Sequence, residues 1–572
     1  MARPERTDPV LAALDACLRD TFTARSLPDV EPELERPKIA EHGDWATSAA
    51  LRMAKHAGRP PRDVAQEIVD HLRVPDVVAE VSIAGPGFVN FRFAHRYHED
   101  LVRRIVASGA GFGQLEPDGP RETINIEFVS ANPTGPLHVG AGRWAATGDA
   151  IAALVEASGH AVVREYYVND AGEQIRRFGE SVVLVDRGAP LGDEHYRGAV
   201  VGDIAARLRA AHDGRALDEV AGGDAPTDPS VVAPDVGATI GSWAVEVVRG
   251  DIESVLERMG VHYDVWYSEQ QGLHESGAIE ATLDALRASG TTYEQDGALF
   301  LSTSAHGDDK DRVLVRSDGR PTYFAADCAY LRDKWERSDR LFYLLGADHH
   351  GYVARVLAAA ECLGIPRERV EIRIGQLVNL LRGGEPVRMS KRSGTTIDLS
   401  EVLDEVGVDV TRYHFLRQGL DTTVDFDLDV VAQQSMDNPV YYVQYAHARI
   451  SSLIRTADDR GFDHGPLEDA DLTILVHPAE LELLRAMAQL PAVVAEAAEL
   501  RATQRLARHA EELAATFHRF YGECRVLVEG AEDGSDPEAV RVSRARYWLA
   551  VASRQVLANA LDLLRVDAPD RM

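Results

Sequence analysis

The segment from residue 123 to residue 167 limits the fold of this 572-residue chain more than any other stretch. Residues 123 to 129 alternate as a strand does, a helical pattern runs from about Val139 to Ser158, and residues 161 to 167 form a second strand pattern. Two strands joined through such a helix lie parallel in one sheet. The segment therefore predicts an α/β domain whose ligands bind beyond the carboxyl ends of its strands.

A histidine and two glycines lie where the first strand gives way to the helix. Gly140 and Gly142 would let a nucleotide approach the backbone, and the helix N-terminus offers amide donors and the positive end of its dipole to phosphate. His138 precedes them, although a lone histidine at such a junction also suits a capping or packing role. No G-x-G-x-x-G fingerprint follows the strand, which argues against a dehydrogenase.

A second stretch suited to phosphate lies farther along, between Gly383 and Gly394. Its glycines, hydroxyl groups and basic side chains are typical of a mobile loop that closes over polyphosphate. Only five of the 61 basic Lys and Arg residues of the chain are lysines, and one of them is Lys391. A compact ammonium group suits the charge that develops on phosphate, whereas a solvated basic loop is the alternative interpretation.

The two stretches together resemble the HIGH and KMSKS signatures of class I aminoacyl-tRNA synthetases. The surrounding sequence is similar to the arginyl-tRNA synthetase family in residues 127–136, 164–172, 322–327, 346–352 and 438–449, and the likeness extends from about Gly43 to Met572. Two positions depart from the signatures. Ala141 replaces the second histidine of HIGH, and Arg388 replaces the first lysine of KMSKS.

The resemblance implies a multi-domain α/β protein. A small N-terminal α+β domain (residues 1–118) would contact tRNA, although it could also be a structural cap. A Rossmann-like parallel-sheet catalytic domain (residues 119–436) would bind the nucleotide and carry an insertion at about 170–320. A C-terminal all-α helical bundle (residues 437–572) would bind the anticodon. Within the insertion, the Gly-, Ala-, Asp- and Pro-rich stretch from about Asp186 to Val236 predicts a loose loop.

The activity implied by the resemblance is ATP-dependent ligation of L-arginine to tRNA(Arg) through arginyl-adenylate, with Mg²⁺ accompanying the nucleotide. The resemblance assigns catalysis to His138, Lys391 and Arg388. It places ATP against His138, Gly140, Gly142, Arg143, Met389, Ser390 and Lys391. It places arginine against Glu127, Ser130, Asn132, Tyr323, Asp327, Asp348 and His349. Two alternatives stay open, a related enzyme that supplies arginyl groups to another pathway and a non-catalytic tRNA-binding protein.

Tyr323 and Asp327 stand four residues apart, so they share one face if they lie on a helix. A carboxylate can accept two hydrogens of the planar, permanently charged guanidinium, and a tyrosine ring can lie against its plane. The pair is therefore suited to the arginine side chain. The alternative is a core tyrosine followed by an aspartate that caps a turn.

The net charge of −31 is unfavourable for a tRNA ligand unless basic residues gather locally. Residues 437–572 carry 15 Arg against 22 Asp and Glu. Their spacing nevertheless predicts helical stripes, one at Arg501, Arg505 and Arg508 and another at Arg541 and Arg544, which are either tRNA contacts or solvated faces. The predicted tRNA-binding residues are Tyr441, Tyr442, Tyr445, Arg449, Arg501 and Arg505, although the tyrosines could equally be core.

Cysteine and apolar patterns indicate the compartment. The four cysteines form no C-x-x-C pair, so we predict no disulfide framework and no metal site, and Asp348, His349 and His350 lack a recognisable further ligand. No run of 18 apolar residues occurs. We therefore expect a soluble, cytoplasmic protein with no membrane partner, acting as a monomer.

Overall fold

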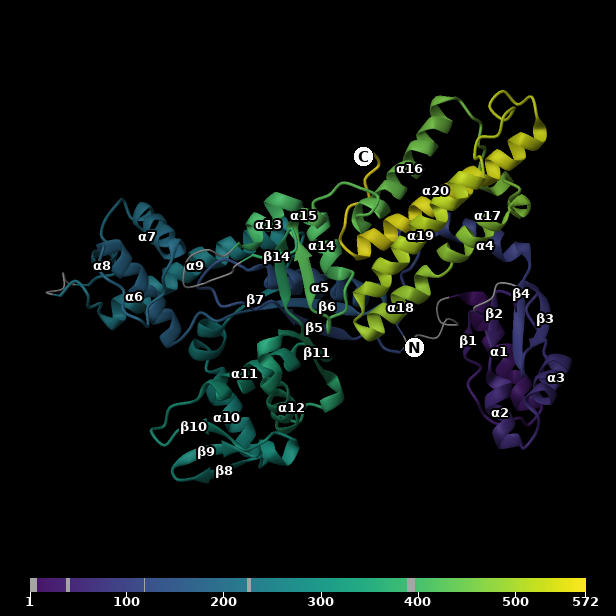
Figure 1. Ribbon diagram of the computed structural model, residues 1–572. Helices are drawn as coiled ribbons and strands as arrows, with labels where there is room; N and C mark the ends of the chain where they lie inside the picture. The colour runs from purple at the N-terminus through teal and green to yellow at the C-terminus, as the bar shows by residue number, and fades with distance from the viewer. Residues whose placement is uncertain (1–7, 38–41, 118, 224–227, 388–396) are drawn as a thin grey trace. The chain divides into compact units, whose positions relative to one another are not determined.

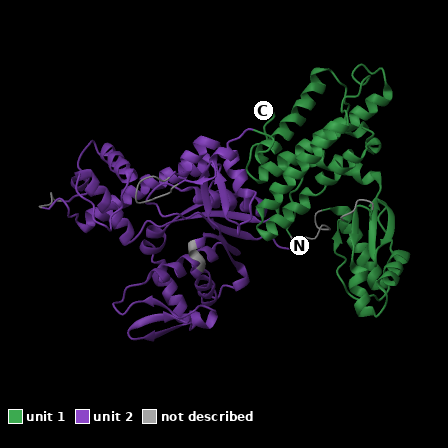
Figure 2. Cartoon of the chain, in the orientation of Figure 1, with its two compact units in different colours: residues 1–118, 157–159, 435–572 green, residues 119–156, 160–434 purple. Residues whose placement is uncertain are grey.

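The computed structural model describes residues 8–37, 42–117, 119–223, 228–387 and 397–572, without the side chains of residues 348–350. The chain divides into two compact units (Figure 2). Unit 1 holds residues 1–118, 157–159 and 435–572, and unit 2 holds residues 119–156 and 160–434. The N-terminal and C-terminal segments therefore belong to the same compact unit, whereas the sequence predicts a separate domain for each of them.

A five-stranded parallel sheet forms the centre of unit 2 (Figure 1). Its strand order is β12-β11-β5-β6-β7. The strands are β5 (Thr123–Phe128), β6 (Ala161–Val168), β7 (Val265–Ser268), β11 (Arg340–Gly346) and β12 (Val370–Gly375). The predicted strand–helix–strand segment is confirmed, because α5 (Val139–Ala157) joins β5 to β6. Central β5 is buried on both faces, with Ile124, Ile126 and Phe128 on one face and Asn125 and Glu127 on the other.

Glycines bring α5 close to the sheet. A Cβ atom at Gly148 would lie 2.3 Å from Cγ of Phe128 on β5, and one at Gly375 would lie 2.0 Å from the ring of Trp144 on α5. Other helices of unit 2 with buried apolar faces are α10 (Ala278–Ser289), α11 (Tyr323–Glu336) and α12 (Val353–Cys362), which share one core with β9 (Ala298–Leu301) and β11. Close helix–sheet packing thus fixes the start of α5.

The insertion is more helical than the sequence predicted. It contains α6 (Glu173–Arg187), α7 (Ala199–Ala211), α8 (Leu217–Val220) and α9 (Pro234–Arg258). The prediction of a loose loop over 186–236 was wrong for α7, whose buried residues Val201, Ile204, Ala205 and Leu208 give it an apolar face. Helices α6 and α9 cross where Gly179 meets Gly237 and Gly241.

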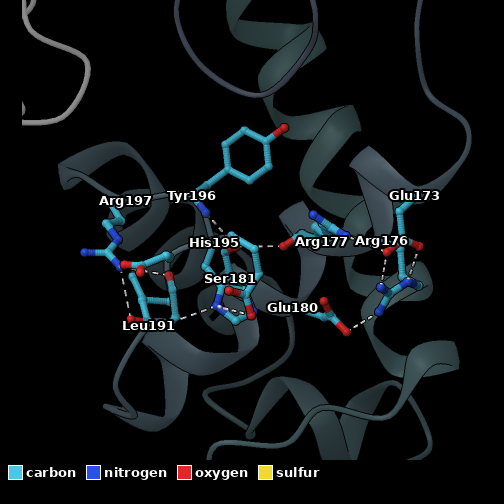
Figure 3. A network of polar contacts seen from close by, with 12 residues as sticks. Glu173, Arg176, Arg177, Glu180, Ser181, Leu191, His195, Tyr196 and Arg197 are labelled. Atoms are coloured by element: carbon cyan, nitrogen blue, oxygen red, sulfur yellow. Dashed lines mark hydrogen bonds and ion pairs between the residues drawn. The ribbon is translucent and has the colours of Figure 1, made fainter.

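Polar contacts join residues of α6 with one another and with the segment that follows this helix (Figure 3). Arg176 pairs with Glu173 and Glu180, and the backbone N–H of Tyr196 donates to Oγ of Ser181 at 3.0 Å. The Nδ1 atom of His195 accepts from the backbone N–H of Gly192 at 2.9 Å. These contacts hold the segment before α7 against α6.

The rest of unit 2 consists of two small sheets and short helices. The antiparallel sheet comprises β8 (Thr292–Gln295), β9 and β10 (Arg312–Val315). The other sheet comprises β13 (Val378–Arg382), β14 (Glu385–Pro386) and β15 (Val424–Asp427). Three short helices lie next to it, α13 (Leu399–Val406), α14 (Val408–Leu416) and α15 (Leu428–Val431).

Unit 1 combines an α+β module with a helical bundle. The module has strand order β1-β2-β4-β3. Its elements are α1 (Pro9–Ala24), β1 (Leu34–Glu35), β2 (Trp45–Thr47), α2 (Ala49–Ala57), α3 (Pro61–His71), β3 (Val78–Ala84) and β4 (Phe88–Phe93). The bundle comprises α16 (Pro439–Asp459), α17 (Pro478–Met487), α18 (Leu490–Leu500), α19 (Thr503–Glu523) and α20 (Pro537–Leu563). Between them in sequence, α4 (His95–Ser108) packs against α20.

Candidate active site and basic cavity

His138 immediately precedes α5, at the carboxyl end of the sheet. The backbone N–H of Leu399 donates to the carbonyl of Leu137 at 2.8 Å and holds this junction. The backbone N–H of Ala141 donates to Nδ1 of His138 at 3.2 Å. Since Nδ1 accepts, the neutral ring carries its proton on Nε2. His138 is exposed, so the ring presents a hydrogen-bond donor at the helix N-terminus.

The two signature glycines have structural neighbours. A Cβ atom at Gly140 would lie 3.0 Å from the His138 ring, and one at Gly142 would lie 2.5 Å from Cδ1 of Leu399. Gly142 thus allows α13 to pack on the start of α5, which is a different reason from the phosphate approach that the sequence suggested. Ala141 is 3% exposed, so the structure has no room for a second histidine side chain at this position.

The side chain of Arg143 faces the interior of unit 2. It is 1% exposed, and its Nη1 and Nη2 atoms donate to the carbonyl groups of Gln376 and Gly419 at 2.8 and 2.7 Å. Burial lowers its pKa to about 10. Its guanidinium ties α5 to the segments around β13. A contact of Arg143 with ATP would therefore fall to its backbone, and that contact stays a prediction.

Strained backbone follows β5 at the edge of the site. Val129 and Ser130 have φ values of 71° and 38°, which are uncommon for residues other than glycine and a genuine outlier for a β-branched valine. The Ser130 hydroxyl donates to Oε1 of Glu127 at 3.0 Å and accepts from the backbone N–H of Tyr167 at 3.1 Å. The strain therefore turns Ser130 back onto the end of β5. Asn132, three residues after Val129, is exposed.

A buried lysine balances two neighbouring carboxylates beneath this edge. Glu127 on β5 and Glu165 on β6 are paired in register, and they are 6% and 0% exposed. Lys334 of α11 is 0% exposed, and its Nζ atom lies 2.7 Å from Oε2 of Glu127. Tyr330 also donates to Oε2, and Arg337 donates to Glu165 at 2.7 Å. Glu127 is therefore already paired with a cation, and its contact with a substrate stays a prediction.

Tyr323 and Asp327 occupy the first turns of α11, as predicted for a shared helical face. The hydroxyl of Thr322 caps this helix by accepting from the backbone N–H of Ala325. Tyr323 is 69% exposed, which rules out the alternative of a core tyrosine. Burial raises the pKa of Asp327 to about 6, although a hydrogen bond from Tyr352 opposes the rise. The ionised form of Asp327 is therefore only partly stabilised by its neighbours in the folded protein.

Glu269 is a residue of this site that the sequence analysis missed. It follows β7 directly, is 4% exposed, and accepts a hydrogen bond from Tyr167 on β6. Burial is the largest cause of its raised pKa. The signal was present in the sequence as a short strand pattern ending in an acid, Val265-Trp-Tyr-Ser-Glu. Its place in the sheet depends on pairing with β6, about a hundred residues away.

Several predicted site residues lie outside the described part of the chain. Arg388, Met389, Ser390 and Lys391 belong to the undescribed segment 388–396. Asp348 and His349 lie in η6 (Ala347–Tyr352), which follows β11, and their side chains are not described. The proposed roles of these residues therefore stay predictions.

Unit 1 contains a basic cavity of about 750 Å³ between α16, the end of α19 and the last residues of the chain. Its described lining includes five arginines and no acidic side chain, with Arg449 among them. Arg449 lies over the rings of Tyr445 and Tyr521, at 5.4 and 4.5 Å from Cζ to the ring centres. Tyr441 stacks on Tyr445 with ring centres 6.2 Å apart. Tyr441, Tyr442 and Tyr445 are all partly exposed rather than core.

One of the two predicted arginine stripes is interrupted in the structure, whereas Arg541 and Arg544 both lie on α20 as predicted. Arg501 ends α18 in the left-handed region with a φ of 55°, so it does not share a helix with Arg505 on α19. Arg505 pairs with Glu496 at 3.0 Å, and Arg541 pairs with Asp471 and Glu538. Arg505 and Arg541 therefore form salt bridges on exposed faces, which is the alternative interpretation of these arginines. We therefore leave Arg501 and Arg505 out of the tRNA surface proposed below.

The described residues lack two further features, a metal-binding cluster and a membrane-spanning helix. Their side chains include no cluster of three or more His, Cys, Asp or Glu suited to a metal ion. Among the same residues, no helix is both long enough and apolar enough to span a membrane.

Family profiles match the chain in three consecutive segments. They are the arginyl-tRNA synthetase N-terminal domain over residues 10–93, the class I (R) tRNA synthetase catalytic domain over 111–413, and the DALR anticodon-binding domain over 443–572.

Similar proteins agree with these profiles. The chain is 47% identical to an arginine–tRNA ligase of Frankia alni, with both chains fully covered, and 46% identical to one of Kineococcus radiotolerans, covering 98% of this chain and all of that one. The structure of Thermus thermophilus arginyl-tRNA synthetase shares the fold, with a TM-score of 0.73 at 23% identity, covering 98% of this chain and all of that one. The chain belongs to the arginyl-tRNA synthetase family of class I aminoacyl-tRNA synthetases.

Proposed function

We propose that this chain ligates L-arginine to tRNA(Arg) with ATP in the cytoplasm, for protein synthesis and as a monomer. The observation that carries the proposal is the full-length similarity to arginine–tRNA ligases. The carboxyl edge of the sheet supports it, because the exposed His138 directly before α5 and the partly exposed Asp327 near the start of α11 both lie near this edge.

The first step joins the arginine carboxylate to the α-phosphate of ATP and releases pyrophosphate. The protein need form no covalent bond, so it acts through positioning and charge stabilisation. The Nε2–H group of His138 and the amides at the start of α5 would hold phosphate oxygens, and Lys391 and Arg388 would meet the charge that develops toward pyrophosphate. Mg²⁺ would arrive with the nucleotide, held mainly by phosphate oxygens and water. The described residues offer no acidic cluster for it.

The arginine substrate would extend from Asn132 to the start of α11. Asp327 would accept hydrogen bonds from the guanidinium, and Tyr323 would lie against its plane. Ser130 and Asn132 would hold the α-amino group. Glu127, Asp348 and His349 complete the proposed arginine site on the strength of the sequence resemblance.

The basic cavity of unit 1 would receive unpaired bases of the tRNA anticodon loop. Bases that leave the stack are bound by aromatic rings and by the faces of arginine side chains. Tyr445 and Tyr521 provide such rings, and Arg449 lies between them. Arg460 of the lining pairs with Glu532, and the other four arginines of the described lining would neutralise phosphates locally, which would offset the net charge of −31.

ATP–pyrophosphate exchange and tRNA charging by the full-length protein test this function. We expect arginine-dependent exchange and charging of tRNA(Arg). Exchange without transfer to tRNA would favour the related enzyme of another pathway, and the absence of exchange both with and without tRNA would favour a non-catalytic binding protein.

A further inference from the structure

We propose that Lys334 is a positioning residue for the substrate: through Glu127 it orients the Ser130 hydroxyl so that this hydroxyl accepts a hydrogen bond from the α-amino group of arginine. The inference rests on the proposed function, which places the α-amino group against Ser130. It adds a buried cation that lies behind the site and acts on the substrate through two other side chains.

The hydrogen bonds of the Ser130 hydroxyl leave one defined position for a ligand. A serine hydroxyl has one hydrogen to donate and two lone pairs that can accept. Its hydrogen is directed at Oε1 of Glu127 at 3.0 Å, and one lone pair accepts from the backbone N–H of Tyr167 at 3.1 Å. Ser130 is partly exposed, so the second lone pair remains for a ligand group that can donate. An ammonium group fits this position because it only donates, whereas a carboxylate does not.

Glu127 sets the direction of this hydrogen bond. An ionised carboxylate can only accept, so the Ser130 hydroxyl must donate to it. The Nζ atom of Lys334 lies 2.7 Å from Oε2 of Glu127, and Tyr330 donates to the same oxygen at 3.0 Å. Oε2 therefore already has two donors, and Oε1 is left for Ser130.

Lys334 keeps Glu127 charged. Its side chain is 0% exposed, and its Nζ atom lies 3.7 Å from the ring centre of Tyr343. An isolated buried charge is strongly unfavourable, so the ammonium group and the carboxylate each depend on the other. The neighbouring carboxylate of Glu165 also pairs with Arg337 at 2.7 Å, so Glu127 depends on Lys334 more than Glu165 does.

The backbone that carries Ser130 is held in a strained turn. Its N–H donates to the carbonyl of Phe128 at 3.1 Å, which closes a γ-turn around Val129, and the φ of 71° at Val129 is that of the rare, strained form. Tyr263 donates to the first carbonyl group of the turn at 3.1 Å, and Tyr166 donates to the carbonyl group that follows the turn at 2.9 Å. Strained backbone persists only where its surroundings over-determine it. The direction of the Ser130 side chain is therefore fixed before arginine binds.

Loss of the cation should reverse the polarity of the Ser130 hydroxyl. A protonated acid or an amide at position 127 can itself donate to Ser130. The hydroxyl hydrogen would then turn toward the ligand position, where it opposes an ammonium group. Binding of the α-amino group is therefore weakened, whereas the guanidinium and nucleotide contacts stay.

The double variant Lys334→Met with Glu127→Gln tests the inference apart from stability, because it removes both partners of the buried ion pair. Its readout is ATP–pyrophosphate exchange with tRNA(Arg) present. We expect the arginine KM to rise about tenfold, with kcat and the ATP KM within about twofold of wild type, because one hydrogen bond to a charged group is lost at the substrate. If the arginine KM returns to the wild-type value together with the unfolding midpoint, Lys334 is only structural and the inference is overturned.

Two arginine analogues give a measurement that a structural role would not change. Desaminoarginine lacks the α-amino group, and agmatine keeps an amino group on the same carbon but lacks the carboxylate. By calorimetry, the wild type should bind L-arginine about tenfold or more tightly than desaminoarginine, and the double variant should reduce this ratio about tenfold. Agmatine should lose about as much affinity as arginine does. An unchanged ratio of arginine to desaminoarginine would overturn the inference.

Single variants separate the possible failures. Ser130→Ala should reduce the same ratio, and adding Lys334→Met to it should reduce the ratio no further. An unchanged ratio in Ser130→Ala would show that the proposed contact with the α-amino group is itself wrong, and the inference would fall with it. A reduced ratio in Ser130→Ala but not in the double variant would overturn the role of Lys334 alone. Arg412→Met, which breaks the buried ion pair with Asp149 at 2.7 Å, is the matched control and should lower stability without changing the ratio.

A milder variant covers the case in which the double variant does not fold. Tyr330→Phe removes one hydroxyl from Oε2 of Glu127 and leaves Lys334 in place. It should still reduce the ratio of arginine to desaminoarginine, by about threefold, because Glu127 loses one of the two donors that hold it. A ratio equal to that of the wild type in Tyr330→Phe would overturn the inference.

Discussion

At Asp327 the proposed role in binding and the stability of the fold oppose each other. Its folded pKa of about 6 lies above the usual value of about 3.9, so the folded protein favours the protonated acid. The stabilising contribution of this group is therefore fully present below about pH 4 and is lost as pH rises through 6. At neutral pH the ionised Asp327 carboxylate is therefore a partly exposed charge that destabilises the fold, and the proposed substrate cation would neutralise it.

Asp327→Asn should therefore separate function from stability. We expect the arginine KM to rise at least tenfold, because a neutral amide replaces the carboxylate that faces the guanidinium. At pH 7.5 the variant should be more stable than wild type by about 1 to 3 kcal/mol, and the difference should vanish near pH 4. Denaturant unfolding at both pH values measures this, and equal midpoints at pH 7.5 would contradict it.

Lys334 is the buried cation that pairs with Glu127. Removing one partner of a buried ion pair leaves the other charge uncompensated, which typically costs about 3 to 5 kcal/mol. We expect this loss for Lys334→Met, partly reversed by adding Glu127→Gln. Lys310→Met, the same change at an exposed lysine, is the control. Denaturant midpoints that match for the two single variants would show that Lys334 is not needed for stability.

At the scale of elements, local pattern predicted the central strands and α5 well. Buried parallel strands read as apolar runs, and the helix between them has its own period. The Ala- and Gly-rich stretch containing α7 was mistaken for a loop because its apolar face rests on few large residues, such as Val201 and Leu208. The break at Arg501 escaped prediction because an arginine adopts the left-handed conformation there, without a glycine to signal it.

Long-range pairing accounts for the remaining misses at the site. Glu269 reaches the sheet edge only through the pairing of β7 with β6, and Arg143 is buried by carbonyl groups from segments more than two hundred residues away. Neither position can be predicted from the sequence that immediately surrounds the residue. Asp327 and Tyr323 were placed correctly on one face because a four-residue spacing is a local property of a helix.

The crossing of α6 and α9 gives a prediction at this scale. A Cβ atom at Gly179 would lie 1.9 Å from the carbonyl oxygen of Gly237 and 2.3 Å from the backbone nitrogen of Gly241. Gly179→Ala must push the helices apart, so we expect a loss of about 1 to 3 kcal/mol or more. Gly202→Ala on α7 meets nothing within 4 Å and should be neutral or stabilising by up to about 1 kcal/mol. Thermal unfolding compares the two, and an equal effect would disprove the steric account.

At the scale of the whole molecule, a strongly acidic protein has an arginine-rich cavity in the described part of unit 1. Local concentration of positive charge can bind phosphate even when the net charge is −31, but the attraction weakens as salt screens it. The affinity for tRNA should therefore fall steeply with rising ionic strength.

Arg449→Ala tests whether this cavity holds tRNA. We expect about tenfold weaker tRNA binding and a salt slope reduced by about one, as for the loss of one phosphate contact. Arg541→Ala, which removes a side chain paired with Asp471 and Glu538, is the control and should leave both values unchanged. Fluorescence anisotropy with labelled tRNA(Arg) over a salt series measures both, and a slope equal to that of wild type would exclude Arg449 from phosphate contact.

The membership of both chain ends in unit 1 has a consequence for synthesis on the ribosome. Helix α4 buries Leu101, Val102 and Ile105 and packs against α20, which begins only at Pro537. At roughly 5 to 20 residues per second, α4 leaves the ribosome about 20 to 90 s before its partner exists. Throughout that interval the apolar face of α4 is exposed to proteases and to chaperones that bind nascent chains. Premature termination before α20 should therefore lead to degradation of the N-terminal module.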